Sequence, residues 1–156
     1  MAGDLNPDPR VRLVTLGDEP LDPAAVLAAV GDRAAGGNVL FVGTVRELTG
    51  DVATTRLEYE AHAPLAQAEL ARLCREAADR FALVAVAVSH RLGIVEPGDV
   101  SVAVAASAAH RREAFAAAEW LMERIKASVP IWKCDHAPGG GRTWVHGHTS
   151  AEHSLP

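Results

Sequence analysis

The chain has 156 residues and a mass of 16.4 kDa, which predicts a single domain. It is 49% hydrophobic and 22% charged, so it can bury a core and is not a disordered chain. The net charge of −5 argues against a general nucleic-acid binder, which needs a broad basic face. An anionic ligand would therefore need a local cluster of cations that acts against the overall field.

The N-terminal residues lack the basic and apolar regions of a secretory signal, and no window approaches 18 uninterrupted apolar residues. We therefore expect a cytoplasmic protein that makes no use of a membrane. Cys74 and Cys134 form no CxxC motif, which favours two reduced thiols over a disulfide. We expect a flexible N-terminus over residues 1–9, a single catalytic domain over residues 10–146 and a flexible tail over residues 147–156.

The apolar pattern of the first part of the chain predicts three strands and one helix. Asp22-Pro23 is typical of an N-cap followed by proline at the first helical position, and Gly36-Gly37 would close that helix. In the third strand, Leu57 and Tyr59 point to one face and the charged residues between them to the other. The predicted elements are strands over residues 11–16, 38–45 and 52–60, a helix over residues 23–33 and a loop over residues 48–51.

The second part of the chain predicts two longer helices and four strands. Apolar residues with a period of 3.6 indicate a helix face formed by Ala66, Leu70, Leu73, Cys74, Ala77 and Phe81. The last helix is expected to bury a stripe of Phe115, Ala118, Met122 and Ile125. The predicted elements are helices over residues 64–81 and 110–128, strands over residues 83–90, 100–106, 131–136 and 142–146, and a turn over residues 95–99. This order predicts an α+β domain whose helices pack on a mostly antiparallel or mixed sheet.

Lysine is rare in this chain, because 13 of the 15 basic residues are arginine. The two lysines, Lys126 and Lys133, lie seven positions apart, and Pro130 reverses the chain between them. An ammonium group near another cation has a lowered pKa and can serve as a base or nucleophile. The pattern therefore suggests a site that requires amines, although two ordinary solvated lysines would give the same pattern.

A second candidate lies at the junction of an apolar strand with the last helix. A helix start offers free N–H groups to an anion such as phosphate, and His110 and Arg111 add donors there. The helix dipole disfavours a cation such as Arg111 in the first turn unless a bound anion offsets the repulsion. Ser107 is a candidate cap, and a helix start with solvated polar residues is the alternative. Arg46 follows a buried strand and is either its first exposed residue or a further cation of the same pocket.

Other polar residues give weaker signals. His146-x-His148 could hold a metal, but no cysteine or carboxylate framework at ligand spacing supports a zinc site, so we expect none. Glu58 and Glu60 could act as paired carboxylates, although solvated or salt-bridged side chains explain them as well. Cys134 is a candidate nucleophile for which the sequence shows no positioned histidine partner.

Several segments, taken together and in this order, resemble the large, catalytic subunit of molybdopterin synthase over about residues 10–146. The most specific of them contain SAHR-like and PIWK-like pieces, and Trp144 resembles the tryptophan that follows the family's glycine turn. The matching segments are FVGTVR (41–46), LEYEA (57–61), HRLG (90–93), PGD (97–99), SAAHR (107–111), LMERIK (121–126) and VPIWK (129–133). The resemblance implies a fold of the α/β hammerhead type with a small antiparallel β extension.

The resemblance also implies an activity and partners. In that family the enzyme converts cyclic pyranopterin monophosphate into molybdopterin by installing a dithiolene. The sulfur arrives as a thiocarboxylate on the C-terminal glycine of a small ubiquitin-like carrier subunit. Two large subunits form a central dimer with a carrier at each end, which makes a heterotetramer. The reaction needs no metal or other cofactor held by this chain, and no cysteine of its own.

Carried onto this sequence, the family pocket would consist of Arg46, His110, Arg111, Lys126, Lys133 and Asp135. Lys126 would be the main catalytic amine, near the end of the carrier's tail, and Lys133 would assist in binding or proton transfer. His110 and Arg111 would hold phosphate or pterin, if need be from the neighbouring subunit.

The chain departs from the family pattern at three positions. Cys134 stands where a cation is usual, Asp135 replaces a glutamate and Thr44 replaces a lysine of some members. Two other functions remain open. One is a non-catalytic dimeric module that binds the carrier or a phosphorylated metabolite, and the other is an unrelated α+β protein with an anion site.

Overall fold

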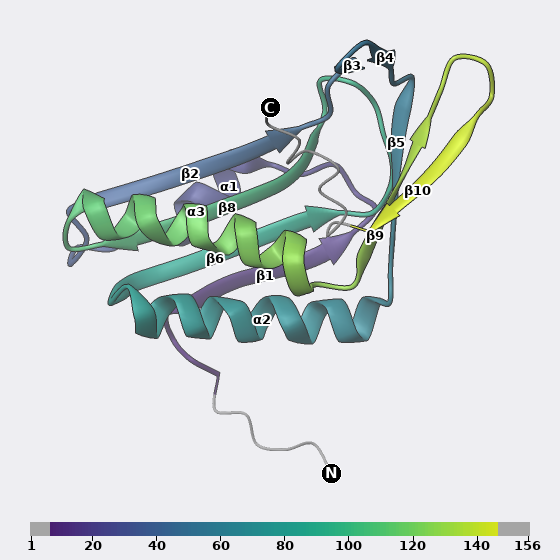
Figure 1. Ribbon diagram of the computed structural model, residues 1–156. Coiled ribbons are helices and arrows are strands. Elements are labelled where there is room, and N and C mark those ends of the chain that lie inside the picture. The colour runs from purple at the N-terminus through teal and green to yellow at the C-terminus, as the bar shows by residue number, and fades with distance from the viewer. Residues whose placement is uncertain (1–6, 147–156) are drawn as a thin grey trace, which may run out of the picture.

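A computed structural model describes residues 7–146 of the protein. Within this range the chain forms two four-stranded sheets, a two-stranded hairpin and three helices (Figure 1). The elements in chain order are β1 Val11–Gly17, α1 Pro23–Ala29, β2 Gly37–Thr44, β3 Leu48–Thr49, β4 Val52–Ala53, β5 Arg56–Ala61, α2 Ala63–Arg80, β6 Leu83–Arg91, β7 Gly93–Val95, β8 Val100–Ala108, α3 Arg111–Ser128, β9 Ile131–His136 and β10 Arg142–His146. The predicted α+β class is confirmed.

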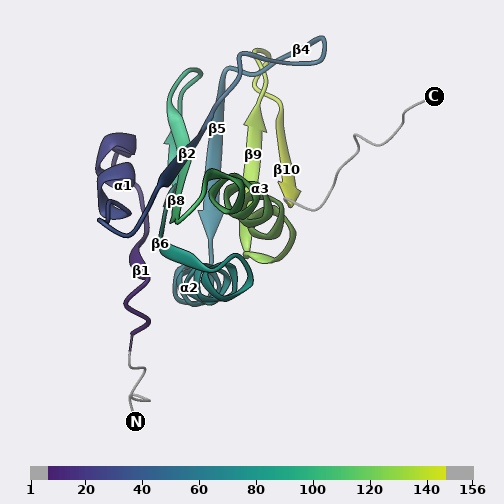
Figure 2. The same cartoon turned by 90° about the vertical axis from the view of Figure 1, so that its left-hand side faces the viewer.

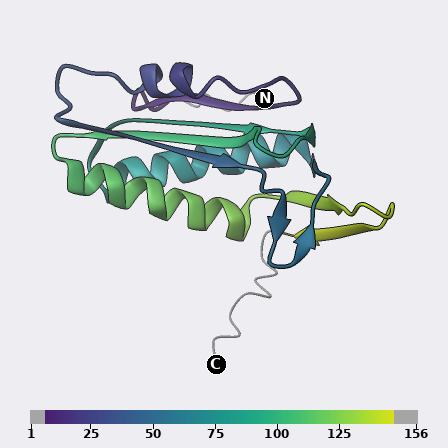
Figure 3. The same cartoon turned by 90° about the horizontal axis from the view of Figure 1, so that it is seen from above.

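The first sheet has the strand order β1-β6-β8-β2 and is mixed, as expected, because β1 runs parallel to β6 while the other pairs are antiparallel. Figures 2 and 3 show α1 on one face of this sheet and α2 and α3 on the other. The larger core lies under α2 and α3, and a smaller core lies under α1. Both faces of β6 and β8 are therefore covered, which explains their nearly continuous apolar sequences.

The second sheet, with the order β10-β9-β5-β7, stands at one end of the first sheet (Figure 1). It contacts the first sheet in part through a small core of Val45, Leu57 and Val95, against which Tyr59 packs, while Ile131 of β9 joins the main core. Val45 directly follows β2, and its backbone exchanges hydrogen bonds with the turn before β8. This contact brings the end of β2 beside the face of the second sheet that carries Leu57 and Tyr59.

The buried face of α3 differs from the predicted stripe. Phe115 is 62% exposed and Met122 is only partly buried, whereas the residues against the sheet are Ala114, Ala117, Ala118, Leu121 and Ile125. Alanines on the helix face alanines and valines of β8, so the backbones approach closely and large side chains are displaced to the edge. The face of α2 is confirmed, with Ala78 fully buried and Phe81 only partly buried.

Two predicted boundaries near the first helix were wrong for local reasons. The helix α1 begins as predicted, with Asp22 accepting the Ala24 N–H, but it ends at Ala29 because a turn capped by Asp32 follows. Gly37 opens β2 instead of closing α1. A Cβ at this position would lie 2.8 Å from the Cα of Arg111, so the close approach of β2 to the start of α3 requires glycine here.

The predicted strand over residues 52–60 is interrupted. Its first part, β4, pairs with β3 in a hairpin turned by Gly50, whose φ of +62° favours glycine. Part of the predicted 95–99 turn also belongs to a strand, β7, which pairs with β5. The hairpin and β7 are short, so their apolar pattern is too brief to be recognised in sequence.

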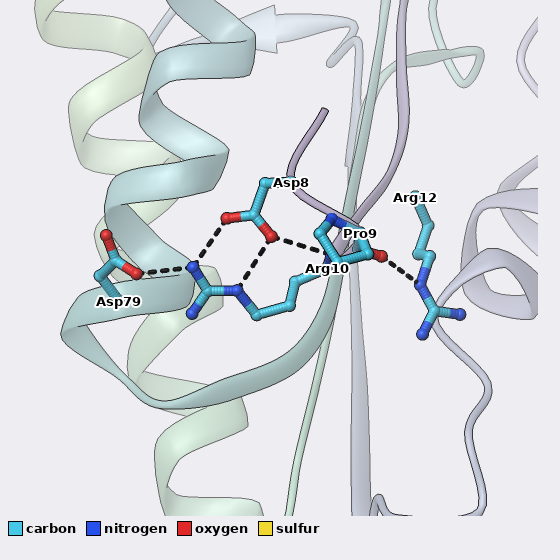
Figure 4. Close-up of polar contacts among 5 residues, drawn as sticks. All are labelled: Asp8, Pro9, Arg10, Arg12 and Asp79. Atoms are coloured by element: carbon cyan, nitrogen blue, oxygen red, sulfur yellow. Dashed lines mark hydrogen bonds and ion pairs between the residues drawn. The ribbon is translucent and has the colours of Figure 1, made fainter. Parts of the chain in front are cut away.

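The N-terminal end of β1 is held to α2 by an arginine clamp (Figure 4). The Arg10 guanidinium donates to Asp8 at 2.7 Å and to Asp79 at 2.6 Å, so one cation bridges two carboxylates from distant segments. The hydrogen bond from Arg10 holds the pKa of Asp8 below its usual value. Asp8 and Pro9 lie within the segment predicted to be flexible. The expectations for residues 1–6 and 147–156 fall outside the described residues.

No helix within residues 7–146 combines the length and the apolar character needed to cross a lipid bilayer. Cys74 and Cys134 are both buried and free, which confirms the prediction of two unpaired thiols. Burial raises the pKa of the Cys74 thiol to about 12, so this group is an inert part of the core.

Candidate active site

Lys133 and Asp135 lie on the same face of β9, because side chains two positions apart in a strand share a face. In the register of the second sheet, Lys133 is opposite Tyr59 and Asp135 is opposite Leu57. Since Leu57 and Tyr59 pack toward the first sheet, both predicted site residues lie on this inner face. Both are partly buried.

Two further candidate residues, which residue type alone did not indicate, are Tyr59 on this face and His90 in β6 of the first sheet. Their rings meet edge to face at 5.2 Å, and the Tyr59 hydroxyl is hydrogen-bonded to Ser101. Burial raises the pKa of Tyr59, and the neighbouring Asp135 carboxylate adds to this rise. Burial lowers the pKa of His90 to about 4, so its ring is neutral at pH 7. The sequence signal for both was their place in the family-like segments.

Lys126 and Arg46 reach the same end of the molecule from two other elements. Lys126 lies in the last turn of α3, which is fixed to α2 by a hydrogen bond of 3.1 Å from Ser128 to Glu69. The chain then passes through buried Val129 directly into β9. Arg46 follows Val45, which packs against Leu57. The elements that carry Arg46, Lys126, Lys133 and Asp135 therefore meet at the end of the first sheet where the second sheet stands, which is the junction of the two sheets.

His110 and Arg111 lie at the opposite end of the first sheet, at the start of α3. Arg111 and Lys126 are separated by 15 residues of one helix, or about 22 Å along its axis. Within a single chain the six predicted residues therefore do not form one pocket. His110 is the N-cap of α3 but its side chain makes no capping bond. Ser107, the proposed cap, is buried in β8 and plays no such role.

The cations of the junction are available for a ligand. Among residues 7–146, the side chains of Arg46, Lys126 and Lys133 form no ion pair, and the same is true of His110 and Arg111. The ion pairs that exist lie elsewhere, for example between Arg12 and Asp32. In a protein of net charge −5, cations that form no ion pair are what the predicted anion site would require.

The opposite, outer face of the second sheet carries a cluster that the sequence did not reveal as such. Glu58 lies opposite Cys134, and His136 follows on the same face of β9. The Nε2 atom of His136 lies 3.0 Å from Glu58 Oε2, and Arg142 contacts the same oxygen at 3.1 Å. These contacts hold the pKa of Glu58 below its usual value and confirm a salt-bridged carboxylate. Cys134 faces away from Lys133, which excludes it as a nucleophile of the inner face.

An exposed apolar groove of about 390 Å³ runs between the edge strand β2 and α3. Phe41 is 42% exposed and Phe115 62% exposed, and both line the groove. A second cavity of about 250 Å³ lies between β1 and α1. Neither includes a predicted site residue, so neither is the predicted anion pocket.

Comparison with known proteins shows which protein family has this fold. The model of the MoaE protein family matches residues 16–128 of the chain. A curated relative in Mycobacterium tuberculosis, named molybdopterin synthase catalytic subunit 1, is 43% identical over 83% of this chain and 88% of its own length. The chain belongs to this family, whose curated members include molybdopterin synthase catalytic subunits.

Solved structures agree with this assignment. The crystal structure of molybdopterin synthase from Staphylococcus aureus is similar with a TM-score of 0.79 and 34% identity, covering 83% of this chain and 94% of that one. A complex of subunits 1 and 2 of molybdopterin-converting factor from Helicobacter pylori has the same fold, with a TM-score of 0.68 and 24% identity over 92% of this chain and 94% of that one. The predicted hammerhead-type fold is therefore confirmed.

Proposed function

We propose that this chain is the catalytic subunit of a molybdopterin synthase. It transfers sulfur from the thiocarboxylated tail of a small ubiquitin-like carrier to cyclic pyranopterin monophosphate and so builds the dithiolene of molybdopterin. Family membership supports the class of reaction. The observation that carries the proposal for the site is the set of unpaired cations at the junction of the two sheets. We further propose a cytoplasmic location, which fits the two free thiols.

The cations at the junction suit this substrate. Opening of the cyclic phosphate and attack by sulfur both develop negative charge, which fixed cations stabilise without reorganising. Arg46 can grip a phosphate with two hydrogen bonds, whereas the compact ammonium of Lys126 acts as a point charge and proton donor. Lys126 is the main catalytic amine in this proposal, since it lies at an exposed helix end where a carrier tail can reach it.

Lys133 and Asp135 assist from the inner face of the second sheet. Lys133 lies opposite Tyr59 and is partly buried, so its ammonium has fewer conformations than a surface lysine. Asp135 lies close enough to Tyr59 to affect its titration. A carboxylate beside an amine gives the site an acceptor and a donor for protons, which is the requirement of general acid–base catalysis.

His110 and Arg111 join the site only from a second copy of the chain. The apolar groove lies at the middle of both β2 and α3, because Phe41 is central in β2 and Glu119 is central in α3. A two-fold axis through this groove would set the start of α3 in one copy beside the end of α3 in the other. Each of the two pockets would then combine Lys126 and Lys133 of one subunit with Arg111 of its partner.

Replacement of Lys126 tests the proposal. Purified Lys126→Ala protein should bind the thiocarboxylated carrier yet form no molybdopterin from cyclic pyranopterin monophosphate, while its circular dichroism spectrum stays that of the wild type. Lys126→Arg, which keeps the charge but not the amine, should also be severely impaired. Arg124→Ala is the matched control, because it removes an exposed cation from the same helix end. Normal turnover by Lys126→Ala would contradict the assigned role.

The second candidate function, a non-catalytic module, makes the opposite prediction for the wild type. It would bind the carrier or a phosphorylated metabolite without releasing product. A protein unrelated to this chemistry would not bind a carrier that ends in Gly-Gly. Co-purification of the carrier, followed by a product assay with the wild-type complex, separates the three functions.

A further inference from the structure

The outer face of the second sheet brings together three different metal-ligating groups. Glu58 of β5 is directly opposite Cys134 of β9, and His136 lies two residues further along the same strand. One ligand atom from each residue lies within 4.8 Å of the other two. The Cys134 side chain is fully buried, and those of His136 and Glu58 are 14% and 23% exposed. The three groups therefore form a compact, partly covered cluster rather than a set of surface charges.

The donor set matches the preferences of zinc. Zinc sites in proteins combine thiolate, imidazole and carboxylate ligands at bond lengths of about 2.0 to 2.3 Å. Tetrahedral geometry at these lengths places ligand atoms about 3.3 to 3.8 Å apart. The nitrogen of His136 and the oxygen of Glu58 are already 3.0 Å apart, and the remaining contacts need to change by about 1 Å. Rotations of side chains on two paired strands can supply this movement without moving the backbone.

Two cations lie near the cluster: Arg142, which contacts it, and the exposed Arg56, which is opposite His136 in the register of the sheet. Arg142 contacts Oε2 of Glu58 and is also hydrogen-bonded to Cys134, so a metal ion would have to displace it from the thiol, while the second carboxylate oxygen of Glu58 can turn to the ion. The Arg142 side chain is also 53% exposed and can withdraw into solvent. An outer partner of this kind orients a ligating carboxylate in many metal sites.

We propose that Glu58, Cys134 and His136 form a three-ligand site for zinc or a divalent metal ion of similar preference, with water in the fourth position. The site lies on the face of β9 opposite to Lys133 and Asp135, so the metal ion would not touch the substrate of the proposed reaction. It would instead join β5 to β9 beyond the backbone hydrogen bonds and fix the strand that carries Lys133. This inference does not depend on the proposed function.

Cobalt(II) titration of the purified, untagged full-length chain tests the site, since cobalt reports a thiolate ligand through a charge-transfer band. The wild type should bind one cobalt ion per chain with this band, and zinc should displace it. Cys134→Ser should lose the band, and His136→Gln and Glu58→Gln should weaken binding at least about tenfold. Cys74→Ala and His148→Ala should both keep the band, which separates the site from the core thiol and from the tail histidines.

Thermal unfolding supplies a second readout that does not require spectroscopy of cobalt. Zinc should raise the melting temperature of the wild type more than that of His136→Gln at the same zinc concentration, because a ligand that binds only the folded state stabilises it in proportion to its affinity. His136 is partly exposed, so this variant is expected to fold like the wild type. Absence of the band in the wild type, or a band that survives in Cys134→Ser, would overturn the proposal.

Discussion

Lys133 and Cys134 are neighbours in β9 but lie on opposite faces of the second sheet. Lys133 lies with Tyr59 on the face toward the first sheet, whereas Cys134 lies with Glu58 on the outer face. The departure from the family pattern at position 134 therefore does not remove a cation from the junction that holds Lys133. It alters the opposite surface, where it places a thiol between a histidine and a carboxylate.

Lys133→Ala should lower kcat/KM for molybdopterin formation by about 100-fold, which is the lower end of the contribution of a positioned acid or base. The reason is the loss of the ammonium on the inner face of β9, beside the Tyr59 and Asp135 side chains. Single-turnover assays with purified thiocarboxylated carrier measure the effect. Glu60→Gln is the control, because Glu60 is exposed on the outer face, and its rate should match the wild type.

Replacement of Phe115 by aspartate should convert a dimer into a monomer. The exposed phenylalanine lies in the apolar groove, where a charge would be desolvated on association. Light scattering coupled to size-exclusion chromatography gives the mass directly. Leu65→Asp changes an apolar side chain of similar exposure outside the groove and should leave the mass unchanged. If Phe115→Asp remained dimeric, the two-fold axis would lie elsewhere.

His90 should make the protein less stable as the pH falls. Burial lowers the pKa of His90 to about 4, whereas an unfolded histidine has a pKa of about 6.5. The stabilisation is complete above pH 6.5 and is lost as the pH falls toward 4, because the unfolded state then binds a proton that the folded state excludes. The free energy of unfolding should therefore decrease by about 2 kcal/mol from His90 alone between pH 7.5 and pH 5.

Urea unfolding of the wild type and of His90→Phe at both pH values measures this difference. Phenylalanine keeps a ring against Tyr59 but has no titrating group. The variant should lose the part of the pH dependence that belongs to His90. Equal pH dependence in the two proteins would show that the ring of His90 can become protonated in the folded state.

The strands and long helices of the fold could be predicted because their apolar patterns extend over many residues. The β3–β4 hairpin and β7 could not, since two or three residues carry no period and depend on tertiary pairing. The sequence pattern also did not predict which face of α3 is buried. Phe115 is as apolar as any core residue, and only the close packing of Ala114 and Ala117 on β8 displaces it to the surface.

The residues of the candidate site stay predictions from the sequence, and their arrangement could not be predicted from it. The rarity of lysine singled out Lys126 and Lys133, and both lie at the junction of the sheets. The helix predicted over residues 110–128 already separates Arg111 from Lys126 along its axis, so a pocket that uses both needs a second copy of the chain, which a linear sequence does not show. The Glu58–Cys134–His136 cluster was missed because its members come from two strands, and no ligand motif is visible within either one.

The most direct test of the shared pocket is complementation between two inactive chains. Lys126→Ala and Arg111→Ala, each inactive alone, should regain about a quarter of the wild-type activity when they are co-expressed and assembled at random. Half of the dimers would then be mixed, and each mixed dimer would hold one intact pocket and one doubly altered pocket. A mixture that stays inactive, although mass measurements show mixed dimers, would contradict a site built from both subunits.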